Sequence, residues 1–303
     1  MTEIENDGIA RSELGRLVEA LSETECDHLL RLVREVAGGE RFWETEISTL
    51  FNQRVKMRAL NSSEGASMAA PAAPETEHGV FAPIPIVKSY QNAERIPLLP
   101  PEALAAPTSE VLNTRRSRRD YTGQAISLQQ LSNLVYYSCG VTGRTQGYGY
   151  VQLPLRTFPS CGGLQDPEAY LSIQSVDGVS PGLFHYHAVD HVLELMRPGE
   201  HGARLRSLSL GQPQLETASV VFLITGCFDR LRWKYGERGY RYMCIDAGYL
   251  GQNIYLTGEA MGLGVCAIAA FMDDAIEEFL GVDGTNETSL LLTTIGVPIA
   301  GVG

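Results

Sequence analysis

The feature that most constrains the fold is a long apolar helix in the C-terminal third of the chain. The residue spacing predicts a helix from about Tyr240 to Met261, ended by Gly262. Its apolar residues do not keep to one stripe. Some share a broad face and others lie outside it: Tyr242, Ile245, Tyr249 and Leu256 on the face, and Tyr240, Met243 and Ile254 elsewhere. A helix that is apolar nearly all round must be buried on more than one side.

Shorter elements alternate before and after this helix. Apolar runs bounded by turn residues predict strands near 169–176, 183–186, 192–195, 220–225 and 290–295, and helices near 204–210 and 273–280. Ser127 and Gln130 form a capping box that opens a further helix. Helices interleaved with hairpin-type strands predict an α+β fold, in which a mostly antiparallel sheet packs against a helical layer.

The first third of the chain differs in composition from the rest. Residues 1–60 are predicted to form an N-terminal helical extension, because apolar residues recur there at helical spacing. Residues 61–107 are low in complexity and then rich in proline, which predicts a linker or an extended arm. The folded domain is therefore expected at residues 108–303.

The net charge excludes two classes of partner. The chain has 24 Lys and Arg against 36 Asp and Glu, a net charge of −12. So acidic a protein gains no affinity from counterion release on nucleic acid, and anionic membranes repel it. No apolar stretch approaches the roughly 20 residues of a membrane span, and the acidic N-terminus lacks a signal-peptide pattern. The sequence predicts a cytoplasmic protein with no nucleic-acid or membrane partner.

One basic segment stands out against this acidic background. Four arginines surround Ser117 within five positions: Arg115, Arg116, Arg118 and Arg119. Guanidinium groups and a hydroxyl match phosphate oxygens well, which favours an anion pocket. The alternative is a solvated charge run that keeps a helix end soluble. The residues alone leave the two interpretations equally open.

Four segments in this order resemble the FMN-dependent nitroreductase superfamily, and within it the SagB-type dehydrogenase branch. They are RRSxR from Arg115, PSCGGL from Pro159, KYGERGYRY from Lys234, and DAG from Asp246 followed by GQN and GLG. The resemblance covers about residues 81–297. It implies the nitroreductase-like α+β fold, with FMN at a homodimer interface to which both chains contribute.

The resemblance also assigns cofactor contacts. Arg115, Arg116, Ser117 and Arg119 would bind the FMN phosphate; Pro159, Ser160, Cys161 and Gly162 would flank the flavin ring; and backbone at Ala269 and Ala270 would face flavin N5. Taken alone, the PSCGG segment is simply a tight turn before a strand. Two departures stand out. Gln165-Asp166 replaces the Tyr-Pro of relatives, and no arginine follows Gly296, so either the cluster at 115–119 suffices or Arg156 substitutes.

Lys234 and Tyr235 are the residues that distinguish the branch. In its azoline-oxidising members, a Lys-Tyr pair lies beside the flavin and takes part in catalysis. Oxidation of a thiazoline or oxazoline removes a ring C–H proton as hydride passes to the flavin. A lysine accepts that proton if burial or a nearby cation lowers its pKa, and Tyr235 would relay or donate it. Without the resemblance, a surface lysine beside a half-buried tyrosine is the simpler interpretation.

The chain is thus interpreted as a homodimeric FMN-dependent dehydrogenase or oxidase. Its expected substrate is an azoline, or a similar amino-acyl unit, of a peptide or carrier-bound natural product. Two alternatives stay open: an NAD(P)H-dependent nitro- or quinone reductase, and a flavin-binding accessory subunit of a peptide-modifying biosynthetic complex. Helices within 12–37 would dock such a partner or extend the dimer.

Three other segments receive simpler interpretations. His185 and His187, with His191 nearby, have no obviously converging acid or cysteine, so no metal site is predicted and they are interpreted as exposed hairpin histidines. Gly262-x-Gly264 lacks the third glycine of a dinucleotide-binding loop. The apolar stretch 262–271 is interpreted as core at the end of the long helix.

Overall fold

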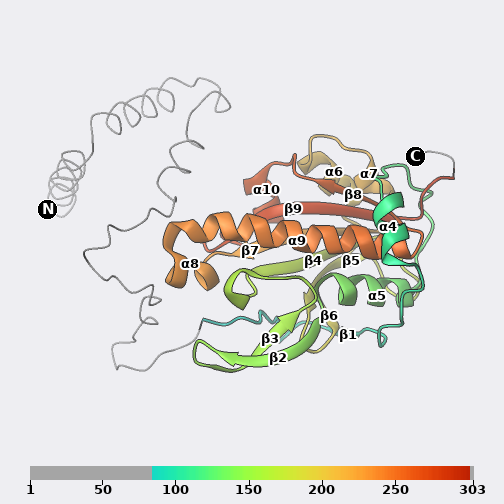
Figure 1. Ribbon diagram of the computed structural model, residues 1–303. Helices are drawn as coiled ribbons and strands as arrows, with labels where there is room; N and C mark the ends of the chain where they lie inside the picture. Colours follow the sequence, from blue (N-terminus) through green and yellow to red (C-terminus); the bar gives the residue numbers. More distant parts are fainter. Residues whose placement is uncertain (1–83, 301–303) are drawn as a thin grey trace, which may run out of the picture. The chain divides into compact units, whose positions relative to one another are not determined.

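A seven-stranded antiparallel sheet organises the chain in the computed structural model, which describes residues 84–300 (Figure 1). The strand order is β1-β6-β5-β4-β7-β9-β8, and every neighbouring pair with a defined register is antiparallel. The strands are β1 (Arg95–Pro97), β4 (Pro167–Ile173), β5 (Gly182–His187), β6 (Val192–Pro198), β7 (Val220–Cys227), β8 (Gly264–Ile268) and β9 (Glu287–Gly296). The prediction of a mostly antiparallel sheet is confirmed. The helices predicted within 1–60 lie outside the described residues.

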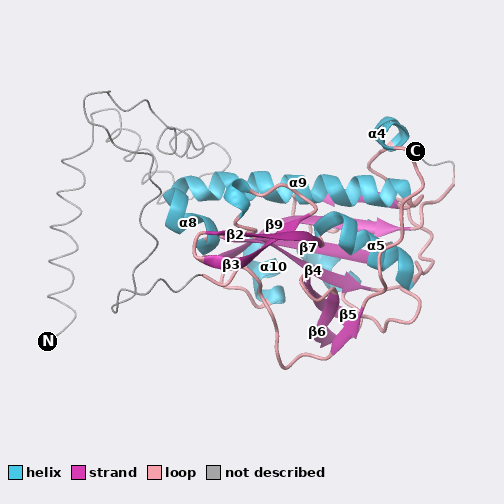
Figure 2. Cartoon of the chain, turned by 60° about the horizontal axis from the view of Figure 1, so that its bottom comes forward, coloured by secondary structure: helices cyan, strands magenta, loops and turns pink. Residues whose placement is uncertain are grey.

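Helices cover both faces of this sheet (Figure 2). One face packs on α5 (Leu128–Cys139) and α9 (Gly239–Ala260), and the other on α6 (Gly202–Leu208), α7 (Gln214–Thr217) and α10 (Asp273–Leu280). The alternation of β4 explains the two layers. Ala169 and Leu171 point into the core beneath α5 and α9, whereas Tyr170 points to the opposite face. No helix of the described residues is long and apolar enough to cross a membrane.

The predicted helix boundaries follow from their caps. Ser127 accepts a hydrogen bond from the Gln130 N–H and its own N–H donates to the Gln130 side chain, which begins α5 as the capping box predicts. Helix α10 ends at Gly281, whose left-handed φ of 75° favours glycine. The smaller helices are α4 (Thr108–Thr114), α8 (Asp229–Tyr235), η2 (Cys161–Gly163) and η3 (Gly236–Arg238).

Helix α9 is buried on one side only within the described chain. Met243 and Ile254 are fully buried against the sheet. Ile245 and Tyr249 lie on its outer side and stay 39% and 45% exposed. The described residues therefore leave an apolar part of the helix surface uncovered.

Three regions differ from the sequence-based expectations. Strand β1 lies in the proline-rich arm and pairs with β6, so the folded domain begins before residue 108. Gly262, with a φ of 72°, ends the long helix as predicted, but the segment after it, interpreted only as core, contains the edge strand β8, which pairs with β9. The hairpin β2 (Val141–Gly147) and β3 (Tyr150–Arg156) was not predicted, since polar and glycine residues mask its alternation.

Candidate functional site

Two motifs more than 70 positions apart in the sequence meet at the turn η2. Gly162 has a φ of 66°, and a Cβ there would collide with the Tyr235 hydroxyl and lie 3.1 Å from Lys234 Nζ. Only glycine therefore allows the turn to approach the end of α8 this closely. The structure brings the predicted turn and the predicted Lys-Tyr pair into one place.

Polar contacts hold this turn in its conformation. The Cys161 N–H donates to Asp246 Oδ2 at 2.7 Å, and the Gln165 N–H donates to Ser160 Oγ at 2.9 Å. Burial, followed by the Asp246 carboxyl, raises the pKa of the Cys161 thiol to about 12. The thiol of Cys161 is therefore protonated and neutral at physiological pH. Pro159, at the start of the turn, is exposed.

Tyr148 is a residue that the sequence reasoning missed. It lies at the tip of the β2–β3 hairpin, where its φ of 51° is unusual for an aromatic residue. Lys234 Nζ donates to the Tyr148 hydroxyl and lies 4.1 Å from the centre of its ring. The Trp233 ring packs edge-on against Tyr148 at 5.7 Å. The repeated Gly-Tyr of residues 147–150 is the sequence signal of this tight tip.

The surroundings of Lys234 keep it protonated. Burial lowers its pKa, but hydrogen bonding to Tyr148 and Tyr235 more than offsets burial, and the pKa of Lys234 is raised. A proton acceptor needs the opposite shift. In this arrangement Lys234 is therefore a hydrogen-bond donor.

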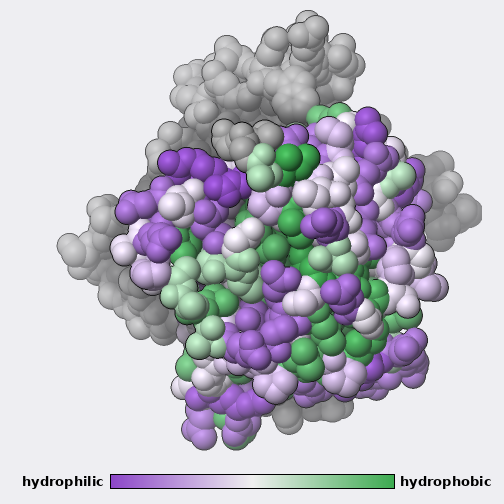
Figure 3. All heavy atoms as spheres, turned by 90° about the vertical axis from the view of Figure 1, so that its right-hand side faces the viewer, coloured by the Kyte–Doolittle hydropathy of each residue, from purple (hydrophilic) through white to green (hydrophobic). Residues whose placement is uncertain are grey.

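The basic cluster lies at the other end of α9. The Arg115 guanidinium stacks 5.0 Å above the Tyr255 ring, and Ser117 Oγ lies 2.8 Å from the Tyr255 hydroxyl. Arg118 pairs with Glu259. Among residues 84–300, the other three arginines of the cluster have no carboxylate partner: Arg115, Arg116 and Arg119. Figure 3, which faces the right-hand side of Figure 1, shows this end of the molecule as a mixture of hydrophilic and hydrophobic side chains.

The remaining predicted residues fall in two further places. Ala269 and Ala270 are exposed directly after β8, and the Ala270 carbonyl accepts from the Gln212 amide at 3.1 Å. Arg156 donates to the Cys139 carbonyl and stacks on Phe158 at 5.4 Å. Arg156 is therefore engaged with the end of α5, which argues against its substitution for a missing phosphate-binding arginine.

The two groups of predicted residues occupy opposite sides of α9. Ser117 contacts Tyr255, whereas Cys161 contacts Asp246, nine positions earlier on the same helix. Nine residues are about two and a half turns, so the two side chains project in opposite directions, about 14 Å apart along the axis. The exposed apolar face of α9 lies between them. The predicted residues of one chain thus lie in two separate places.

The prediction that His185 and His187 are exposed is wrong. His185 is fully buried and His187 is 7% exposed, because β5 lies between β4 and β6 in the interior of the sheet. His185 bridges two carboxylates, Glu168 at 3.1 Å and Glu194 at 3.0 Å. Burial lowers the pKa of His185, but these two hydrogen bonds more than offset it and raise the pKa. The site is a buried ion cluster, and the sequence signal was only the His-x-His alternation.

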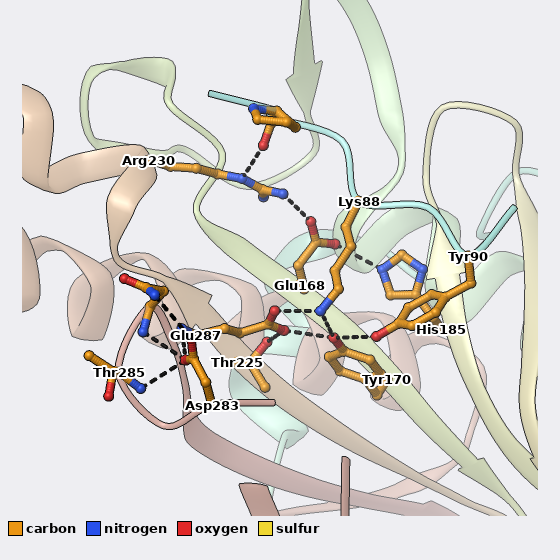
Figure 4. A network of polar contacts seen from close by, with 12 residues as sticks. Lys88, Tyr90, Glu168, Tyr170, His185, Thr225, Arg230, Asp283, Thr285 and Glu287 are labelled. Carbon is orange, nitrogen blue, oxygen red and sulfur yellow. Dashed lines mark hydrogen bonds and ion pairs between the residues drawn. The ribbon is translucent and has the colours of Figure 1, made fainter. Parts of the chain in front are cut away.

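The proline-rich arm closes this cluster from outside (Figure 4). Lys88 reaches from the arm to Glu287 at 2.5 Å and to the Tyr170 hydroxyl at 2.6 Å. Arg230 pairs with Glu168 at 2.5 Å. A cavity of about 360 Å³ borders these groups, but its charged side chains are already engaged with one another. We therefore interpret the cluster as a structural anchor of the arm.

Comparison with known proteins identifies the chain at this point. The sequence profile of the nitroreductase family matches residues 112–297, more than half of the chain. The chain belongs to the nitroreductase family. The nitroreductase-type protein MJ1384 of Methanocaldococcus jannaschii is 32% identical over 187 residues, which are 62% of this chain and 89% of that protein.

Two further relatives are named for the trifolitoxin operon and for the processing of microcin B17. The trifolitoxin operon protein TfxC of Rhizobium leguminosarum bv. trifolii is 25% identical over 64% of this chain and 56% of its own length. The microcin B17-processing protein McbC of Escherichia coli is 26% identical over 46% of this chain and 54% of its own length. The chain thus spans little more than half of these two relatives.

Solved structures confirm the nitroreductase-like fold. A nitroreductase structure from Anabaena variabilis is 27% identical with a TM-score of 0.57, covering 68% of this chain and 42% of that one. The E. coli microcin synthetase McbBCD complex with truncated pro-MccB17 bound contains a chain of TM-score 0.50 and 20% identity, covering 82% of this chain and 85% of that one. The second match bears on the fold alone.

Proposed function

We propose that this nitroreductase-family chain is an FMN-dependent dehydrogenase that desaturates an azoline, or a similar amino-acyl unit, of a peptide or carrier-bound natural product. The observation that carries the proposal is the contact of Lys234 and Tyr235 with the turn at Gly162. The branch-specific pair and the flavin-flanking turn are far apart in sequence, and a shared site is the reason for them to meet. The similarity to McbC, which is named for microcin B17 processing, supports a substrate of this class.

The residues fit FMN in charge and in shape. Arg115, Arg116 and Arg119 are cations of an acidic protein without a carboxylate partner in the described part of the chain, and Ser117 adds a hydroxyl beside them. Charge-assisted hydrogen bonds from such groups hold a phosphate. At the turn, Gly162 leaves the backbone free of a side chain, which permits close approach of a flat ring. Ala269 and Ala270 offer exposed backbone beyond β8.

We infer that the complete site forms between two chains. The basic cluster and the turn point away from each other across α9, so one chain cannot close both around one cofactor. In a two-fold pair, each patch of one chain meets the other patch of its partner. Association through Ile245 and Tyr249 would also cover the exposed apolar face of α9.

FMN supplies the acceptor for the hydride that leaves the substrate C–H bond. Lys234 takes the accompanying proton at Nζ once its hydrogen bond to Tyr148 is broken, because burial then lowers its pKa with less opposition. Tyr235, next to Lys234 and the turn, orients the ammonium group and relays its proton. Trp233 forms an apolar wall beside both residues.

The test is the rate at which a thiazoline-containing peptide reduces the flavin, followed anaerobically by stopped flow. Loss of a positioned general base typically lowers a rate about 10²–10⁴-fold. Lys234→Ala is expected to retain FMN and lose rate by roughly that factor, with a milder loss for Tyr235→Phe. Equal reduction rates in the wild type and Lys234→Ala would refute the base role.

A second candidate, an NAD(P)H-dependent nitro- or quinone reductase, is favoured by the 32% identity to MJ1384. NAD(P)H delivers hydride without losing a proton from carbon to a base. On this alternative, NAD(P)H reduces the flavin rapidly and Lys234→Ala changes turnover little. The same stopped-flow experiment with NAD(P)H in place of the azoline separates the two functions.

A further inference from the structure

Two buried aspartates lie beneath the turn η2 without a donor between them. Asp166, directly before β4, and Asp246, on α9, have no exposed surface. Among the described residues, neither oxygen of Asp166 nor Oδ1 of Asp246 has a hydrogen-bond partner. The Asp246 carboxyl is nevertheless the side chain that acts most strongly on the carboxyl of Asp166 and raises its pKa beyond the effect of burial. Only Oδ2 of Asp246 is engaged, by the Cys161 N–H at 2.7 Å.

The surrounding groups do not neutralise this pair. Arg230 is the cation that acts on Asp166, but its guanidinium donates to two backbone carbonyls and to the Glu168 carboxylate. The other titratable groups around the pair are the thiols of Cys161 and Cys244. From β7, the backbone N–H of Cys227 reaches the Asp166 carbonyl rather than its side chain. Two ionised carboxylates here would repel each other and remain without donors, which is costly in a buried place.

We propose that Asp166 and Asp246 share one proton, and that this proton positions the turn η2 for the flavin. The proton gives one carboxyl an O–H that donates to the other, so the pair carries one negative charge. Asp246 then keeps an oxygen for the Cys161 N–H. Both aspartates are positioning residues, because neither is exposed to substrate. The second half of the proposal rests on the proposed FMN function, and the sharing of the proton does not.

Two further observations support the pair. Burial and the Asp246 carboxyl raise the pKa of Asp166 well above its ordinary range, against the opposing charge of Arg230. Gln165, next to Asp166, is 2% exposed, adopts a φ of 55°, and leaves its Oε1 without a partner. Gln165-Asp166 is also where this sequence departs from the Tyr-Pro of the branch it resembles. The unsatisfied buried polar groups and the departure from the motif thus fall on the same residues.

A shared proton has a defined effect on stability. An aspartate in the unfolded chain loses its proton near pH 3.9, whereas the native pair retains one proton well above that pH. The native state therefore binds more protons, and the stability from this site is lost as pH rises. The equilibrium constant for unfolding increases by up to about tenfold per pH unit until the pair ionises.

The test of the shared proton uses the full chain and two variants. Asp166→Asn and Asp246→Asn each replace the shared O–H by an amide N–H₂, which donates at every pH. Infrared spectra near neutral pH are expected to show the C=O band of a protonated carboxylic acid in the wild type and not in either variant. Between about pH 5 and pH 8, urea unfolding is expected to show a steeper loss of stability with rising pH in the wild type than in either variant, because the raised pKa of His185 contributes to all three proteins alike. A wild type without the band, or with the same slope as both variants, overturns the shared proton.

FMN titration tests the positioning role separately. Asp246→Ala removes the acceptor of the Cys161 N–H and is expected to weaken FMN about tenfold, the scale of one hydrogen bond. Asp246→Asn keeps an amide oxygen for this N–H and is expected to restore the affinity. Equal affinities in the wild type and Asp246→Ala overturn the positioning role. A wild type that shows the acid band but binds no FMN refutes the proposed function and retains the proton pair. If Asp246→Ala does not fold, the two asparagine variants and the wild-type spectrum still decide whether the proton is shared.

Discussion

Arg230 and Arg119 are arginines of the same acidic chain, but they lie in opposite surroundings. Arg230 is 3% exposed and donates to two carbonyls and the Glu168 carboxylate. Arg119 is exposed and has no carboxylate partner within residues 84–300. The groups of charges around them also differ in whether the charges are paired. The cluster around His185 pairs charges of both signs, whereas the basic segment and the aspartates beneath η2 each leave charges of one sign unpaired.

This difference separates a structural role from a binding role. A buried charge that is fully paired holds segments together, and the Lys88–Glu287 contact holds the arm on the sheet in this way. A charge without a partner on a folded surface is free to bind a ligand of opposite sign. We therefore expect substitutions in the His185 cluster to change stability and substitutions at 115–119 to change cofactor affinity.

The largest expected effect is on cofactor affinity. Arg115→Ala combined with Arg119→Ala removes two charge-assisted phosphate bonds, each worth about 1.5–3 kcal/mol. The dissociation constant of FMN is expected to rise by roughly 10²–10⁴, with an unchanged free energy of unfolding of the apoprotein. Fluorescence titration and urea unfolding measure the two quantities. Arg118→Ala is the control, because Arg118 already pairs with Glu259. Full flavin retention in the double variant would contradict the assignment.

A similar loss, in stability rather than affinity, is expected at Arg230. Arg230→Met removes one of the two cationic partners of the buried Glu168 and leaves only His185, and breaking a buried ion pair typically costs about 3–5 kcal/mol of unfolding free energy. Arg232→Met, on the same helix, removes a cation from an exposed pair with Asp229 and is expected to cost about 0–1 kcal/mol. Urea unfolding measures both changes. Equal losses in the two variants would show that burial of the pair does not matter.

The sequence predicted the regular parts of this fold for physical reasons. Local signals suffice where they act within one element, as in the capping box of Ser127 and the left-handed Gly281. They fail where pairing partners are distant. Strand β1 is three residues long and exists because β6 offers an edge to it, and β8 follows a helix whose apolar pattern continues into the strand.

In the candidate site too, residues marked by a local motif could be predicted, and residues defined by distant contacts could not. The basic cluster and the Lys234–Tyr235 pair are visible as contiguous motifs. Asp166 and the burial of His185 depend on contacts between residues far apart in the chain, so no local pattern reports them. The Gly-Tyr repeat marks the hairpin tip at Tyr148 but not its contact with Lys234. His185 in particular was interpreted as exposed because Glu168 and Glu194 lie on the two neighbouring strands.

The smallest expected effect concerns Lys234, a cation that, like the basic segment, is proposed to act on a ligand. The quantity tested is the pKa of Lys234. Burial lowers the pKa of Lys234, and hydrogen bonding to Tyr148 and Tyr235 raises it further than burial lowers it. Tyr148→Phe removes one of these hydrogen bonds and keeps the aromatic ring, so the pKa of Lys234 is expected to fall. A larger unprotonated fraction then moves the acid limb of the rate profile for azoline-driven flavin reduction to lower pH. Near pH 7 the rate is expected to rise, by less than about tenfold. Tyr150→Phe, on the same hairpin but bonded to the Ile84 carbonyl, is the control and is expected to leave the profile in place. A profile of Tyr148→Phe that stays fixed, or moves to higher pH, would mean that Tyr148 does not restrain the proton of Lys234.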